Sequence, residues 1–180
     1  MLRKVLVWTA SVLGPALLVV GLGNAQQPTA QAPNPLDVIP DQLPFNVPYG
    51  SPISLQRAQS VINAAMGEAS RRGWPLNIAV VDSGANLVAF ARMDGAMLAS
   101  IAIAEHKARA AVKFRRPTKA FEDAIQKSDF KYLLVSDDII ASRGGIPLIE
   151  GGKIIGGIGC SGGVGAQDEA ACMVGAMTIK

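Results

Sequence analysis

Glycine is concentrated in the C-terminal third of the chain, where ten of the 19 glycines lie between Gly144 and Gly165. Within this stretch, Gly151-Gly152 separates two short apolar runs, over 146–150 and 153–159. A two-glycine loop between such runs is typical of a tight hairpin, because both loop residues must adopt positive φ. A hairpin pairs its strands antiparallel, so this segment argues against an all-parallel sheet.

A second hairpin is predicted upstream, with strands over 77–82 and 86–92 and turn chemistry at Asp82-Ser83-Gly84-Ala85. Helices are predicted around the two hairpins. The first begins after the N-cap Ser54 and ends at Gly73, and the others cover 97–112, 118–127 and 167–178. Residues 128–143 stay unassigned, with Tyr132 to Val135 as candidates for burial.

The order of these elements contains no β-α-β repeat. We therefore expect an α/β fold of the α+β kind, in which helices pack on a mainly antiparallel sheet. That sheet is expected to have five strands, made of the two hairpins plus a possible extra strand.

Residues 1–25 have the organisation of a secretory signal peptide. Arg3 and Lys4 precede an uncharged apolar run over 5–22, and Gly23 and Ala25 occupy the −3 and −1 positions of a cleavage site. An uncleaved membrane anchor is the alternative, since the run approaches spanning length. Because Gly14-Pro15 interrupts the run, we favour cleavage. The expected product is periplasmic or extracellular, with no stable membrane insertion after cleavage.

Residues 26–52 hold seven of the eleven prolines and are predicted to form a semi-rigid linker. Residues 53–180 then form the single folded domain. Without Arg3 and Lys4, 15 of the 17 basic residues remain against 14 acidic ones. This balance argues against a nucleic-acid partner, which needs a concentrated basic surface.

The two cysteines, Cys160 and Cys172, would meet an oxidising compartment after export, where cysteines can pair. Cys160 ends a predicted strand, and Cys172 lies two turns into the next helix, which is expected to carry it away. We therefore expect two buried free thiols rather than a disulfide. One histidine and two cysteines are also too few for a typical structural zinc site.

The segment from Gly157 to Gly162 matches the G-x-G-x-x-G dinucleotide fingerprint, but the residues after it read as one helix. They lack the strand and the acidic residue that such a site requires. A glycine turn entering a helix still exposes free N–H groups that suit an anion. The candidate anion-binding residues are Gly159, Ser161, Gly162 and Gly163, although Asp168 and Glu169 could satisfy the helix dipole internally.

His106 is the only histidine in the chain. Three roles stay open for it: a solvent-facing or structural residue, a haem axial ligand, or a general base. Lys107 falls on an alanine-rich helix face, which makes it a candidate to line a pocket and contact an anionic ligand. Nucleophilic catalysis has little support, because the only histidine that could activate Ser161 as a base, His106, comes from a distant helix. We assign no catalytic residue and do not favour an enzyme.

Several motifs in order resemble the GlcG/HbpS family, also called the haem-degrading or DUF336 family. They are Val80-Val81-Asp82, Arg92 to Ala96, Lys107-Ala108-Arg109, Phe114 to Thr118, Gly144-Gly145, Gly156 to Gly163, and Gln167-Asp168-Glu169. The resemblance covers about residues 53–177. It implies a profilin-like domain, self-association into a homo-oligomer, and haem binding in some members.

One departure from the family concerns the residue after the Lys-Ala-Arg run. Family helices commonly continue with a threonine that is implicated in haem contact in one branch, whereas this chain has Ala110. If haem is the cofactor, His106 is the strongest remaining candidate for its axial ligand. Arg92, Arg109 and Arg116 are then candidates to pair with its propionates.

Two functions follow. The first is an exported small-ligand-binding protein that binds, senses or scavenges haem. The alternative is an enzyme or accessory subunit that acts on a small organic acid in an exported oxidoreductase system. In that case Lys107, Arg92 and the turn over 159–163 would form the anion pocket.

Overall fold

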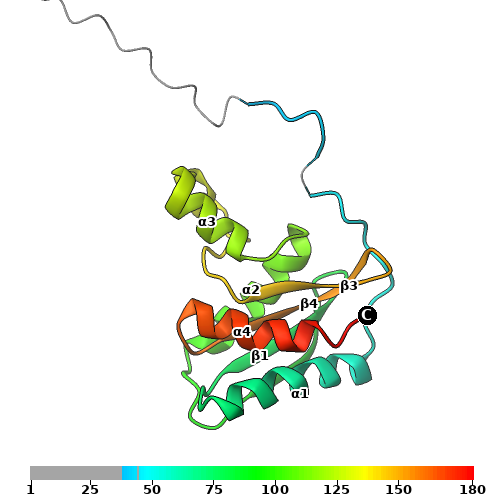
Figure 1. Cartoon of the computed structure of the whole chain (residues 1–180), viewed down its shortest axis with the longest axis vertical. Coiled ribbons are helices and arrows are strands. Elements are labelled where there is room, and N and C mark those ends of the chain that lie inside the picture. The colour runs from blue at the N-terminus through cyan, green and yellow to red at the C-terminus, as the bar shows by residue number, and fades with distance from the viewer. Residues whose placement is uncertain (1–37, 44) are drawn as a thin grey trace, which may run out of the picture. The chain divides into compact units, whose positions relative to one another are not determined.

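The computed structural model describes residues 38–43 and 45–180, so the predicted signal peptide and part of the predicted linker lie outside it. The elements, shown in Figure 1, are α1 (Leu55–Arg71), β1 (Asn77–Asp82), β2 (Leu87–Arg92), α2 (Ser100–Lys113), α3 (Lys119–Ser128), the 3₁₀ helix η2 (Lys131–Val135), β3 (Gly145–Glu150), β4 (Lys153–Ser161) and α4 (Gly165–Ala176). In this described part, no helix has the length and apolar character needed to cross a bilayer.

The sheet has the order β2-β1-β4-β3, and each neighbouring pair is antiparallel. The predicted mainly antiparallel sheet is therefore confirmed, and both predicted hairpins are present. Five strands are not found: the described residues form four. The segment over 128–143 contains η2 instead of a strand, and its Tyr132 and Val135 are exposed rather than buried.

Linker residues 48–50 pair briefly with the start of β4, and they are the described residues that most nearly form a further strand. Tyr49 makes a single parallel bridge with Ile154. Ile154 donates to the carbonyl of Pro48, and Gly50 donates back to Ile154, both at 2.8 Å. Because the flanking Pro48 and Pro52 have no N–H to donate, the pairing does not extend into a strand.

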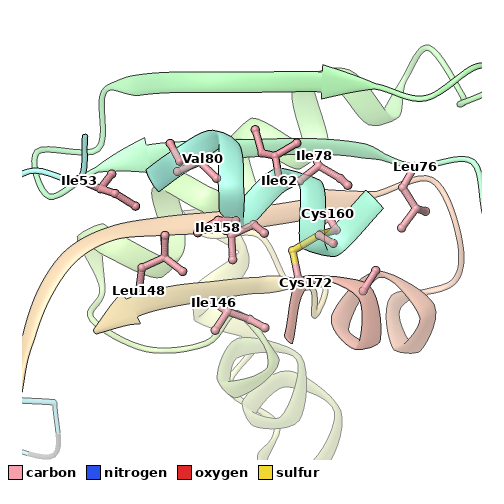
Figure 2. Packing of buried hydrophobic residues seen from close by; sticks show 14 of the residues in the cluster. Ile53, Ile62, Leu76, Ile78, Val80, Ile146, Leu148, Ile158, Cys160 and Cys172 are labelled. Carbon is pink, nitrogen blue, oxygen red and sulfur yellow. A yellow bond between two sulfur atoms is a disulfide. The ribbon is translucent and has the colours of Figure 1, made fainter. Parts of the chain in front are cut away.

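The sheet separates two layers of helices, with α1 and α4 on one face and α2 on the other (Figure 1). Alternate residues of β1 face opposite layers, as the period of a strand requires. Ile78 and Val80 pack in the core beneath α1 and α4, shown in Figure 2, whereas Ala79 and Val81 pack against α2. The predicted N-cap is confirmed, since Ser54 Oγ accepts the N–H of Arg57.

Glycines in β4 allow α2 to lie directly on the sheet. A Cβ on Gly159 would stand 2.0 Å from the carbonyl oxygen of Ala104, and one on Gly157 would stand 2.8 Å from that of Ala108. Real Cβ atoms do not approach oxygen so closely, so these glycines are required by helix packing. Gly159 faces the backbone of α2, which is a packing role rather than the predicted anion-binding role.

The prediction of two free thiols is wrong. Cys160 and Cys172 form a disulfide with a Cα–Cα distance of 5.7 Å, and both residues are fully buried in the core (Figure 2). The prediction assumed that the helix carries Cys172 away from the strand. Instead, α4 packs back against β4. From Gly165 to Cys172 the helix spans eight residues and rises about 10 Å, which returns the chain over the length of the preceding turn.

Candidate functional site

The structure brings some of the predicted site residues together and separates others. Arg92 lies exposed at the end of β2, and Ser161 is buried at the end of β4. Both strands pair there with Asn77, so these two residues flank the same end of β1. Lys107 lies inside the domain, and His106 and Arg109 are half-buried on α2. Lys107 also contacts the strand end and turn that contain Ser161 and Gly163, through the carbonyl of Cys160 and the carboxylate of Asp168.

Lys107 is the centre of a buried polar network. Its Nζ lies 2.8 Å from Oδ2 of Asp168 and 3.2 Å from the carbonyl oxygen of Cys160. The side chains of Lys107 and Asp168 are only 1% and 3% exposed. Oδ1 of Asp168 accepts the N–H of Gly163 at 3.0 Å. Burial raises the pKa of the Asp168 carboxyl, while the hydrogen bond from Lys107 opposes that rise.

This network engages two of the groups predicted to form the anion pocket. The anion in contact with Lys107 is Asp168 of the chain itself, and the N–H of Gly163 is used by the same carboxylate. Gly162 has φ 146°, and a Cβ there would stand 2.6 Å from the carbonyl oxygen of Pro75, so it is a packing glycine. The ammonium group of Lys107 and the N–H of Gly163 are therefore both engaged by a carboxylate of the chain itself.

His106 has the unsatisfied ring nitrogen that a ligand role requires. Its Nε2 is buried and has no hydrogen-bond partner in the described part of the chain. The residue as a whole is half-buried on α2. Ala110, one turn further on, is fully buried and carries no donor atom. Where metal coordination is concerned, no cluster of three or more histidine, cysteine, aspartate or glutamate residues occurs within 38–43 and 45–180.

The three predicted arginines differ in their partners. Arg109 forms an ion pair with Glu105 at 2.9 Å, within one turn of α2. Arg92 is exposed and has no carboxylate partner among the described residues. Arg116 is half-buried, donates from Nε to the carbonyl of Phe114 at 3.0 Å, and stacks on the ring of Phe45. Burial lowers the pKa of Arg116.

Sequence reasoning did not anticipate an open cavity of about 320 Å³ between the end of α1 and the β2–α2 turn. Its lining residues are Ser70, Gly73, Trp74, Pro75, Met93 and Asp94. None of the predicted site residues lines it. Met93 and Asp94 belong to the motif over 92–96, but the other lining residues come from the end of α1 and the turn after it, so the sequence alone did not mark a cavity.

The sequence also gave no sign of the contact that holds the segment before β3 against α3. Arg143 donates to Glu122 from its backbone N–H at 2.9 Å and from Nε at 2.8 Å. These hydrogen bonds hold the pKa of Glu122 below its ordinary value of 4.5. Neither residue belongs to a recognisable motif, and they lie 21 positions apart in the sequence.

The Glu122 contact predicts an acid-sensitive contribution to stability. Unfolded Glu122 has the higher pKa, so the unfolded chain takes up a proton first as the pH falls below about 4.5, and stability is lost there. We expect Glu122→Gln to cost about 1 kcal/mol at pH 7 and less at pH 3.5. Urea unfolding at both pH values measures this. The cost is the free energy of unfolding of wild type minus that of the variant at the same pH, because both proteins share the opposite pH dependence of Asp168. An equal cost at both pH values would contradict the prediction.

The chain is similar to known proteins over most of its described part. The family described as "Haem degrading protein HbpS-like" matches residues 53–177. Protein GlcG of Escherichia coli K12 is 36% identical over 110 residues, which cover 61% of this chain and 81% of that protein. The crystal structure of HbpS matches with 27% identity and a TM-score of 0.66, covering 75% of this chain and 95% of that one. The crystal structure of the PduOC–haem complex matches with 26% identity and a TM-score of 0.65, covering 72% of this chain and 96% of that one.

Proposed function

Since this chain belongs to the HbpS-like family, whose description is haem degrading protein, we propose that it binds haem as an exported protein. The similarity to the PduOC–haem complex over 72% of the chain supports a haem ligand. The observation in this chain that carries the proposal is the unpartnered Nε2 of His106. Imidazole nitrogen is a common axial ligand of haem iron.

The residues around this nitrogen define how haem can be held. Ala110 occupies the place where some family members have a threonine, and it has no oxygen to offer. His106 is therefore the residue of α2 that would hold the iron, and a bound haem would supply a redox-active metal. Because Nε2 is covered, the groups that cover it must move before it can reach a ligand.

Export is proposed on two features. The sequence of residues 1–25 has the order of a signal peptide, with cleavage after Ala25. The buried disulfide of Cys160 and Cys172 supports an oxidising location, since disulfides persist in the periplasm and outside the cell. We propose a periplasmic or extracellular protein.

Self-association is also proposed. Tyr132, Leu134 and Val135 of η2 expose apolar side chains on the surface, and Val135 is 87% exposed. Apolar groups gathered in this way are typical of an interface. A homo-oligomer would cover them.

Haem titration tests the proposal. We expect wild type to bind haem with a Soret band typical of a nitrogen ligand, and His106→Ala to bind at least tenfold more weakly with a shifted band. The matched control is Met97→Leu, which removes another potential iron ligand from an exposed position near the start of α2. The control is expected to bind as wild type does. Equal affinity and spectra for His106→Ala would remove His106 from the site, and no binding by wild type would refute haem binding itself.

A further inference from the structure

The end of α2 has an unusual residue in a common motif. Phe114 is the C-cap of the helix. Beyond it, Arg115 donates its N–H to the carbonyl of Val112 at 3.1 Å, and Arg116 donates to that of Ala111 at 3.2 Å. This pair of bonds defines a Schellman motif, whose first residue after the cap has positive φ and is usually glycine. Here that residue is Arg115, with φ 55°.

A left-handed arginine costs stability relative to glycine at the same place. Such strain persists where the side chain has a function that glycine cannot supply. The backbone motif itself does not need an arginine. A reason for this residue should therefore lie in its guanidinium group.

The charges of Arg115 and Arg116 are not neutralised within the described residues. Arg57, Arg71, Arg72, Arg109 and Arg143 each form an ion pair with a carboxylate. The neighbouring Lys113 and Lys119 are also paired, with Asp138 and Asp123. Arg115 and Arg116 are half-buried and have no carboxylate partner in residues 38–43 and 45–180. Partly buried cations of this kind favour an anion.

Aromatic rings of the linker stack against both guanidinium groups. The Cζ atom of Arg116 lies 3.3 Å from the ring centroid of Phe45, and that of Arg115 lies 5.7 Å from the ring centroid of Tyr49. Tyr49 is itself fixed by hydrogen bonds from its hydroxyl to the carbonyls of Val112 and Lys113. Stacking covers a face of each guanidinium and leaves in-plane N–H donors for an oxyanion; in Arg116 these are the terminal N–H groups, since Nε already donates to the carbonyl of Phe114.

We propose that Arg115 and Arg116, ordered by Phe45 and Tyr49, form a binding site for a doubly charged oxyanion of the phosphate or dicarboxylate class. Two adjacent guanidinium groups offer paired N–H donors and two positive charges. A bound dianion would neutralise both. This site does not require that His106 bind haem, although the two carboxylates of a haem are one source of the same chemistry.

Calorimetric titration of the full chain with inorganic phosphate, at low ionic strength, tests the site. We expect wild type to bind phosphate, and Arg115→Gly to bind at least tenfold more weakly while its melting temperature stays the same or rises. Arg116→Lys keeps the charge but removes the planar pair of donors, so it should also weaken binding. The matched control is Lys153→Gln, which removes an exposed cation outside the site and should leave phosphate affinity unchanged.

A second arm separates a free oxyanion from the carboxylates of haem. It compares haem with its dimethyl ester, which lacks those charges, on wild type and Arg115→Gly. The proposal is supported, with haem as the source, if wild type prefers haem to the ester and the variant loses that preference. It is overturned if wild type does not bind phosphate and Arg115→Gly prefers haem to the ester as strongly as wild type does. It is also overturned if Arg115→Gly binds normally but melts lower, because Arg115 would then be structural. Should haem not bind, the phosphate arm alone decides.

Discussion

Lys107→Ala is expected to lower the free energy of unfolding by about 3–5 kcal/mol, the range for removal of one partner from a buried ion pair. Lys107 and Asp168 are both almost fully buried, and their contact is 2.8 Å. Without the ammonium group, the Asp168 carboxylate stays buried with only the N–H of Gly163 as a partner. Urea unfolding of the variant at pH 7 measures the loss. The sequence-based expectation of a ligand-contacting lysine implied almost no loss.

Two further variants separate the ion pair from general packing. In Lys107→Met/Asp168→Asn no buried charge remains, so the double variant should be clearly more stable than Lys107→Met alone. Lys113→Ala is the matched control for a lysine of the same helix. Its ion pair with Asp138 has side chains that are 43% and 56% exposed, and its loss should cost less than about 1 kcal/mol. Equal losses for Lys107→Ala and Lys113→Ala would show that the buried pair does not stabilise the domain.

The second large effect is expected from the disulfide. The bond joins residues 12 positions apart, and the chain-entropy relation gives about 2–3 kcal/mol for a loop of that length. We expect Cys160→Ala/Cys172→Ala to lose this amount in urea unfolding. Because the bond restrains the unfolded chain, its removal should lower the urea midpoint and somewhat raise the slope m, so the free energy is taken from a fit of both.

A thiol assay with and without denaturant provides the control for the disulfide prediction. The oxidised protein should show no reactive thiol in either condition. Two thiols that appear only after unfolding would support the free-cysteine expectation and contradict the bond. Wild-type stability in the double variant would show that the bond adds nothing.

Local patterns predicted most of the fold. The loop at Gly151-Gly152 and the N-cap Ser54 depend on a few neighbouring residues, and both were correct. Strand β1 was predicted with its observed bounds, since its apolar run ends at a turn. The extra strand had no defined place in the prediction, and it was not found among the described residues: over 156–159, β4 is paired with β1 on one side and β3 on the other.

The candidate site was less predictable, because its contacts join distant positions. Lys107 was placed correctly on the inner face of its helix, but its partner Asp168 lies 61 positions away. Sequence spacing gave no sign that α4 would bring that carboxylate to it. The disulfide was missed for the same reason, since the packing of α4 on β4 also brings Cys172 to Cys160. His106 could be singled out as the sole histidine, whereas its unpaired nitrogen could be found only in the structure.

The order of strands has a consequence for how quickly the domain can fold. Each hairpin joins strands that are close in the chain, but the central pairing of β1 with β4 brings together residues such as Val80 and Ile158. Closing a loop that long costs entropy before the new contacts repay it, so pairing across the middle of the sheet is slow relative to hairpin formation. We expect both hairpins to form early and the meeting of β1 with β4 to limit the folding rate. Until then, each hairpin has one unpaired inner edge that another chain could occupy.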